Sequence, residues 1–222
     1  MTTYREVISE SVTNRGTGHK EYVDIGVNGT LMRGLELETN LINLQAKFVR
    51  EDYTERTYRL FSIDDIYPGM VRLPASGLEK ANPVSVAIEI WSIPASGVAI
   101  LLEKEPPGLS IGKIKLKDGN TEILGILAEP TLIVGKKDIS DFPGDGIANF
   151  RDYIFREGMR IIDEALKQKT NLTQDELSTV QTFREAAGLL SKADKLREAI
   201  ELLNCGVKKL GLTNRLFQNI SP

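Results

Sequence analysis

The sequence has little of the two residue types on which most disulfides, zinc sites and histidine-dependent triads depend. Its 222 residues include one cysteine, Cys205, and one histidine, His19. One cysteine cannot form a disulfide within the chain and fits a reducing compartment, so we expect a cytoplasmic protein. One histidine and one cysteine cannot build a zinc site of the usual ligands, and we expect no metal and no cofactor. Acid–base chemistry would have to use carboxylates, lysine or tyrosine.

The sequence also lacks long apolar runs and an excess of positive charge. No window approaches about 18 consecutive apolar residues, so we expect no membrane span. The first ten residues carry charges where a signal peptide needs an apolar stretch. Lysine and arginine number 28 against 31 aspartates and glutamates, which gives a net charge of −3. That balance argues against nucleic-acid binding, which needs a basic face.

An early loop does stand out, because it carries two glycines, Gly29 and Gly34, after an apolar run. The run, residues 22–27, alternates in character and predicts a strand. Glycine allows the backbone to take a positive φ or to approach a ligand closely, and Thr30 can cap a turn. The pattern fits either a ligand-binding loop or an ordinary turn from a strand into a helix.

The residues up to about 148 read mostly as strands. The clearest strand covers 84–91, where β-branched residues alternate with smaller or polar ones. Pro68-Gly69 predicts a turn, and Asp118-Gly119 predicts a tight hairpin between strands 111–117 and 121–128. Residues 94–102 predict a short helix, which the prolines that follow would stop.

From residue 149 the apolar spacing becomes helical. A helix over 149–169 is followed by the capping-box pattern Thr173–Glu176 and two further helices. We expect a β domain at 1–150 and a helical extension at 151–222, with Cys205 buried in the last helix. Helices of this length are marginal alone, so they either fold back on the β domain or pack against a partner. We expect a homodimer formed through them.

Five segments, in order, resemble the C-terminal domain of allophanate hydrolase. They hold a glycine loop, a Tyr-Arg-Leu strand with a Pro-Gly turn, a Glu-aliphatic-Trp strand, a Pro-Gly-Leu hairpin and a closing aspartate loop, at 22–37, 56–72, 84–94, 107–116 and 123–153. The glycine loop also resembles that of the wider gamma-glutamylcyclotransferase-like fold. The resemblance implies an α+β fold, in which a small mixed β-barrel carries the glycine loop at its mouth and a helical extension follows.

The resemblance also implies a site for a small ligand that carries a carboxylate and an amide or carbamate group. The loop would hold the anion through its backbone amides, and its binding residues would be Gly29, Thr30, Leu31, Met32, Arg33 and Gly34. In the cyclotransferases a glutamate from a later loop transfers protons, and Glu105 or Glu103 lies at about that place. Glu105 is the better candidate because it adjoins the Pro-Pro-Gly loop. Such an enzyme would be a hydrolase, a decarboxylase or a cyclotransferase-like enzyme.

Other interpretations stay open at this stage. Glu103 and Glu105 also fit the pattern of two solvated glutamates. Arg33 fits either a clamp for a carboxylate or a solvated side chain. Tyr67 fits either a hydroxyl that faces a pocket or a packing residue. The chain also fits a non-catalytic assembly or accessory subunit that partners a separate amidase. Leu31 favours this alternative, because the allophanate hydrolase loop often carries a histidine at that place.

Overall fold

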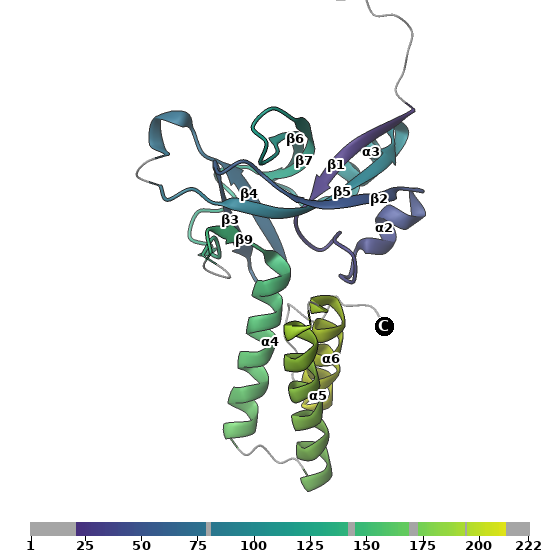
Figure 1. Cartoon of the computed structure of the whole chain (residues 1–222), viewed down its shortest axis with the longest axis vertical. Helices are drawn as coiled ribbons and strands as arrows, with labels where there is room; N and C mark the ends of the chain where they lie inside the picture. Colours follow the sequence, from purple (N-terminus) through teal and green to yellow (C-terminus); the bar gives the residue numbers. More distant parts are fainter. Residues whose placement is uncertain (1–20, 79–80, 142–144, 169–172, 194, 212–222) are drawn as a thin grey trace, which may run out of the picture.

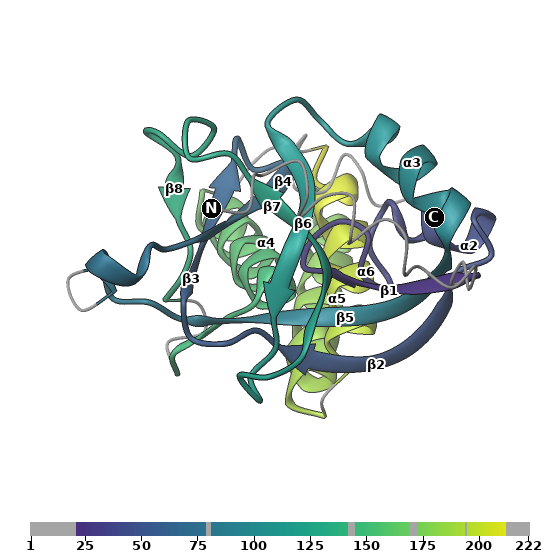
Figure 2. The same cartoon turned by 90° about the horizontal axis from the view of Figure 1, so that it is seen from above.

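The computed structural model describes residues 21–78, 81–141, 145–168, 173–193 and 195–211. Two β-sheets occupy one end of the molecule, and a bundle of three helices occupies the other (Figure 1). Viewed along the long axis, the sheets lie over the helical bundle (Figure 2). The mixed α+β class that the sequence predicts is confirmed.

The larger sheet has the strand order β2-β5-β1-β7-β6, with β9 paired to β5. Its strands are β1 (Tyr22–Val27), β2 (Lys47–Tyr53), β5 (Ser85–Pro94), β6 (Leu109–Lys115), β7 (Glu122–Ala128) and β9 (Ile147–Ala148). The smaller sheet has the order β4-β3-β8. Its strands are β3 (Tyr58–Ile63), β4 (Tyr67–Arg72) and β8 (Lys137–Asp138). The predicted strands at 22–27, 84–91 and in the Asp118-Gly119 hairpin are thus confirmed.

Strand β5 is the longest strand of the larger sheet and contributes many residues to the core. It pairs antiparallel with both β1 and β2, and its residues from Val86 to Trp91 are all buried. One of them, Glu89, is charged, although none of its surface is exposed. Long burial on both faces explains the run of β-branched residues here. A buried carboxylate in such a strand requires partners, which are described below.

The structure does not show the closed barrel that we expected. In the described residues, the outer strands β2 and β6 meet only at an isolated bridge between Thr54 and Leu116. Beyond that bridge no ladder joins them, and almost every residue of β2 is exposed. The charged side chains Lys47, Arg50 and Glu51 keep this edge in water, which is a common protection of an unpaired strand edge.

The helices are α2 (Glu38–Asn43), α3 (Ala95–Lys104), α4 (Phe150–Lys167), α5 (Gln174–Lys192) and α6 (Leu196–Lys209), with a short 3-10 turn, η1 (Ala75–Gly77). The predicted capping box is present: Thr173 and Glu176 bond to each other's backbone N–H groups at the start of α5. Gly206 lets α6 approach α4 closely, because a Cβ there would lie 2.9 Å from Cδ1 of Ile162. Helices α4, α5 and α6 of the bundle bury part of their apolar faces on one another.

Two local predictions were wrong, and one helix was missed. Pro68-Gly69 lies inside β4, and the turn falls at Asp64 and Asp65, whose φ angles are 53° and 56°. Helix α2 was not predicted. Cys205 is exposed, because the apolar stripe of α6 runs through its neighbours instead.

The domain boundary near residue 150 and the homodimer through the helices stay predictions. Within the described ranges, none of the helices combines the length and the apolar character needed to cross a membrane.

Candidate functional site

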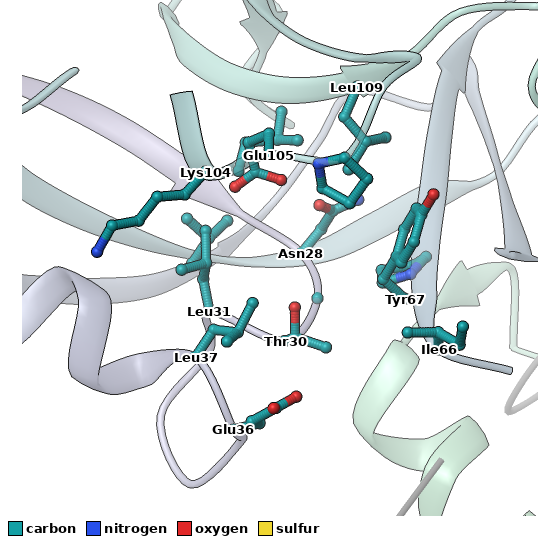
Figure 3. Close-up of a pocket in the computed structure, with 15 residues that line it drawn as sticks. Asn28, Thr30, Leu31, Glu36, Leu37, Ile66, Tyr67, Lys104, Glu105 and Leu109 are labelled. Atoms are coloured by element: carbon teal, nitrogen blue, oxygen red, sulfur yellow. The ribbon is translucent and has the colours of Figure 1, made fainter. Parts of the chain in front are cut away.

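A cavity of about 230 Å³ opens between the glycine loop, the start of β4 and the segment that follows α3 (Figure 3). A cavity of this size admits a small metabolite rather than a polymer. Residues from four separate stretches of the chain line it: Val27, Asn28, Gly29, Thr30, Leu31, Glu36, Leu37, Ile66, Tyr67, Pro68, Lys104, Glu105, Pro106, Leu109 and Ile126.

The first glycine of the loop allows one wall of this cavity to form. A Cβ at Gly29 would lie 2.5 Å from Cγ of Pro68, so a larger residue would push the loop and β4 apart. The loop then turns back through a 2.8 Å hydrogen bond from the Met32 N–H to the Gly29 carbonyl. Gly29 therefore allows the loop to lie close against β4, and this close packing shapes the cavity.

The backbone amides of three consecutive loop residues donate no hydrogen bond within the described residues. These residues, Gly29, Thr30 and Leu31, all line the cavity. A run of unpaired amide donors is a common arrangement for binding an anion. Each hydrogen bond to a charged oxygen is worth about 1.5–3 kcal/mol net. The first half of the loop thus has the chemistry that a carboxylate needs.

The second half of the loop is engaged by the protein itself. Met32 is fully buried, and the Arg33 guanidinium forms ion pairs with Glu89 and Glu51 at 3.1 and 2.9 Å. The Gly34 N–H donates a 2.7 Å hydrogen bond to the Glu38 carboxylate. None of Met32, Arg33 and Gly34 lines the cavity. The structure therefore brings only the first half of the predicted binding set to the site.

Asn28, which precedes the loop, is a candidate that the sequence did not single out. Its side chain is buried and faces the cavity (Figure 3). Its Nδ2 atom has no hydrogen-bond partner among the described residues. An unpaired buried donor costs about 1–3 kcal/mol, which a ligand oxygen at this place would relieve.

Glu105 is the candidate acid–base group that the structure brings to the cavity (Figure 3). It follows the last residue of α3, and Pro106 prevents the helix from continuing. Burial raises the pKa of the Glu105 carboxyl from 4.5 to about 7. A group with that pKa can both give and take a proton near neutral pH. Glu103, by contrast, is exposed and does not line the cavity, so its proposed acid–base role has no geometric support.

Three further polar side chains complete the lining. Burial raises the pKa of the Glu36 carboxyl and that of the Tyr67 hydroxyl. Lys104 donates a 3.2 Å hydrogen bond to Asn40 from the exposed edge of the cavity. The sequence had left open whether Tyr67 faces a pocket, and Tyr67 does line the cavity. Glu36 and Lys104 were not predicted, because contacts between distant segments bring them to the cavity. In the part of the chain that the structure describes, no cluster of three histidine, cysteine, aspartate or glutamate residues could hold a metal ion.

Comparisons with known proteins agree with this fold. A search of curated proteins found no match. Among solved structures, c4763, a protein specific to uropathogenic Escherichia coli, is 45% identical over 60% of this chain and 94% of its own, with a TM-score of 0.53. Allophanate hydrolase of Kluyveromyces lactis is 22% identical over 61% of this chain and 21% of its own, with a TM-score of 0.53. Urea amidolyase of the same yeast is 20% identical over 66% and 9%, with a TM-score of 0.54.

The two yeast enzymes share the fold with this chain, which spans about a fifth of allophanate hydrolase and less of urea amidolyase. The family model of the allophanate hydrolase C-terminal domain matches residues 23–153, which is more than half of the chain. That match covers the glycine loop, Glu105 and every other residue of the cavity lining. The chain belongs to the allophanate hydrolase C-terminal domain family.

Proposed function

We propose that this chain binds a small ligand that carries a carboxylate and an amide or carbamate group, and that Glu105 exchanges a proton with it. One observation carries the proposal: Glu105, with a pKa of about 7, shares a cavity with the three unpaired amides of residues 29–31. Those amides would bind the carboxylate, and Asn28 Nδ2 would donate to a carbonyl oxygen of the ligand.

The chemistry of a carbamate suits a protonated carboxyl group. A carbamate releases carbon dioxide when its C–N bond breaks, the bonding pair stays on nitrogen and the nitrogen gains a proton. Glu105 lines the cavity and would supply that proton, since a pKa of about 7 keeps a useful fraction of its carboxyl protonated near pH 7. Allophanate, a carboxylated urea named in one of the similar structures, is the first compound of this class to test.

Two measurements on the full chain test the proposal. Calorimetry with malonamate, in which a CH₂ group replaces the carbamate nitrogen of allophanate, measures binding without reaction. Release of carbon dioxide and urea from allophanate measures turnover. We expect Glu105→Gln to keep malonamate binding and to lower turnover roughly 10²- to 10⁴-fold. Glu103→Gln, at the exposed neighbouring glutamate, is the matched control and should behave as the wild type.

Three outcomes would change the proposal in different ways. Malonamate binding without turnover would assign the chain to the alternative, a non-catalytic subunit that keeps the ligand site and works beside a separate amidase. Turnover that is unchanged in Glu105→Gln would remove Glu105 from the chemistry. A wild-type chain that does not bind malonamate at millimolar concentration would overturn the carboxylate site itself.

A further inference from the structure

Two arginines of the helical bundle act on the glycine loop from outside the cavity: Arg197 contacts Gly34, and Arg151 binds two carboxylates that also bind Arg33. Arg151 stands in the first turn of α4, and Arg197 in the first turn of α6. Neither lines the cavity, and Arg33 and both of these arginines line a second, polar cavity between the larger sheet and the bundle. These contacts tie the loop to a part of the chain that lies mostly outside the family match at residues 23–153.

Arg151 acts on the loop through the buried carboxylate of Glu89. One oxygen of Glu89 accepts hydrogen bonds from the Arg33 backbone N–H at 2.9 Å and from Trp91 Nε1 at 3.2 Å. The other accepts from Arg33 Nε at 3.1 Å and from Arg151 Nη1 at 3.0 Å. A fully buried carboxylate holds its geometry only while its charge and lone pairs are compensated. Arg151 therefore helps to hold the acceptor that fixes the loop backbone at Arg33.

A second carboxylate strengthens the same connection. Glu51 accepts a 2.9 Å hydrogen bond from Arg33 Nη2 and a 3.1 Å hydrogen bond from Arg151 Nη2. The guanidinium groups of the loop and of α4 are thus joined by two bridging carboxylates, one buried and one exposed. Networks of this kind resist local opening more than a single surface pair does.

Arg197 contacts the loop directly at its second glycine. A Cβ at Gly34 would lie 2.2 Å from Cγ of Arg197, so the arginine stem rests on bare backbone. Gly34 has a φ of 80°, which other residues rarely adopt. The Arg197 guanidinium bonds to Glu201 at 3.3 Å within α6, which keeps the stem along the helix. The second glycine of the loop is therefore a contact with α6 rather than with the ligand.

We infer that Arg151 and Arg197 are positioning residues for the glycine loop, and that the helical bundle thereby sets the ligand affinity of the cavity. The inference rests on the proposed function for its effect on affinity. Its structural part, that the two arginines hold the loop, stands apart from any ligand. A protein or modification that moves α4 or α6 would change ligand binding without touching the cavity.

The test compares Arg151→Met and Arg197→Ala with a matched control, Arg184→Met, in the full chain. Arg184 pairs with Asp163 between α5 and α4, so its loss weakens the bundle without removing a described contact to the loop. Amide hydrogen exchange reports the loop directly, through the hydrogen-bonded N–H groups of Arg33 and Leu37. Malonamate calorimetry reports the affinity.

We expect both loop variants to speed exchange at Arg33 and Leu37 roughly tenfold, while amides in the middle of β5 exchange as in the wild type. Malonamate affinity should fall by about the same factor, and Arg184→Met should change neither. Arg151→Lys, which keeps the charge, should recover part of both effects and serves if the methionine variant does not fold.

Unchanged loop exchange in the folded Arg197→Ala and Arg151 variants would overturn the inference. So would equal acceleration in Arg184→Met, because the effect would then be a general loss of stability. If the wild type fails to bind malonamate while the loop variants still speed exchange, the proposed function is wrong and the positioning role stands.

Discussion

The backbone N–H of Arg33 donates a 2.9 Å hydrogen bond to the buried carboxylate of Glu89, 56 residues further along the chain. This bond fastens the second half of the glycine loop to the buried strand β5. The first half, Gly29 to Leu31, is left to line the cavity with unpaired amides. We therefore expect stability to depend on one half of the loop and ligand binding on the other.

Removing the Glu89 carboxylate should strongly destabilise the fold. Glu89→Ala leaves Arg33 and Arg151 with only the exposed carboxylate of Glu51, and we expect a loss of about 3–5 kcal/mol in the free energy of unfolding. Urea denaturation measures it, with Glu122→Ala as the control, because Glu122 is an exposed residue of β7 that forms no ion pair within the described residues. The control should change stability by no more than about 0.5 kcal/mol. A loss below about 1 kcal/mol for Glu89→Ala would show that the network contributes little.

Gly34→Ala should destabilise more than Gly119→Ala, although both glycines have a positive φ. At Gly119, where φ is 71°, an added Cβ meets nothing within 4 Å, so only the backbone strain of about 1–2 kcal/mol applies. At Gly34 the same strain is joined by the collision with Arg197, which we expect to add about 1 kcal/mol because the side chain can shift.

A double-mutant cycle isolates that collision. Adding Arg197→Ala to Gly34→Ala removes the atoms that the new Cβ meets, so the double variant should recover about 0.5–1 kcal/mol relative to the sum of the single losses. Equilibrium unfolding in urea measures all four proteins. Strictly additive losses would mean that Arg197 does not rest on Gly34 in solution.

Glu105 should make the stability of the fold depend on pH. Its pKa is about 7 in the folded state against 4.5 for an ordinary glutamate, so the folded state holds the proton more tightly. The free energy of unfolding should therefore fall as pH rises from about 4.5 to about 7, by at most roughly 3 kcal/mol, and then level off. Glu105→Gln should lack this fall and be more stable than the wild type at pH 8. Parallel curves for the two proteins from pH 4.5 to 8 would contradict the raised pKa.

Asn28→Ala should weaken ligand binding more than it weakens the fold. The substitution removes a buried donor without a partner, so we expect stability to change by about 1 kcal/mol or less and malonamate affinity to fall roughly 5- to 20-fold. Asn204→Ala is a matched control, because Asn204 is also buried with an unpaired polar atom but does not line the cavity. Equal affinity losses in the two variants would remove Asn28 from the site.

Local patterns predicted much of the fold. The alternation in β5, the Asp118-Gly119 hairpin and the Thr173–Glu176 capping box each depend on neighbouring residues, and all three are present. The turn at Asp64 and Asp65 was not predicted because these non-glycine residues take a positive φ. The Pro68-Gly69 pair, which the sequence favoured as the turn, lies in β4. The missing barrel closure depends on how far β2 and β6 approach each other, which no local pattern encodes.

The sequence predicted part of the site, and the rest depends on contacts between distant segments. The first three loop residues and Glu105 followed from a family resemblance, and they do meet at one cavity. Arg33 looked like a ligand-binding group because its two partners, Glu51 and Glu89, lie on strands whose packing against the loop the sequence does not reveal. Asn28 was overlooked because only its burial shows that its amide lacks a partner.

The most direct test of the ligand site is the pH dependence of malonamate affinity, measured by calorimetry between pH 6 and pH 9. The ligand stays ionised throughout this range, so an ionised Glu105 would repel it and a protonated Glu105 would not. We expect wild-type affinity to fall up to about tenfold per pH unit above pH 7, and Glu105→Gln to bind with little pH dependence. Wild-type affinity that is constant with pH, or an equal fall in Glu105→Gln, would contradict a carboxylate site beside Glu105.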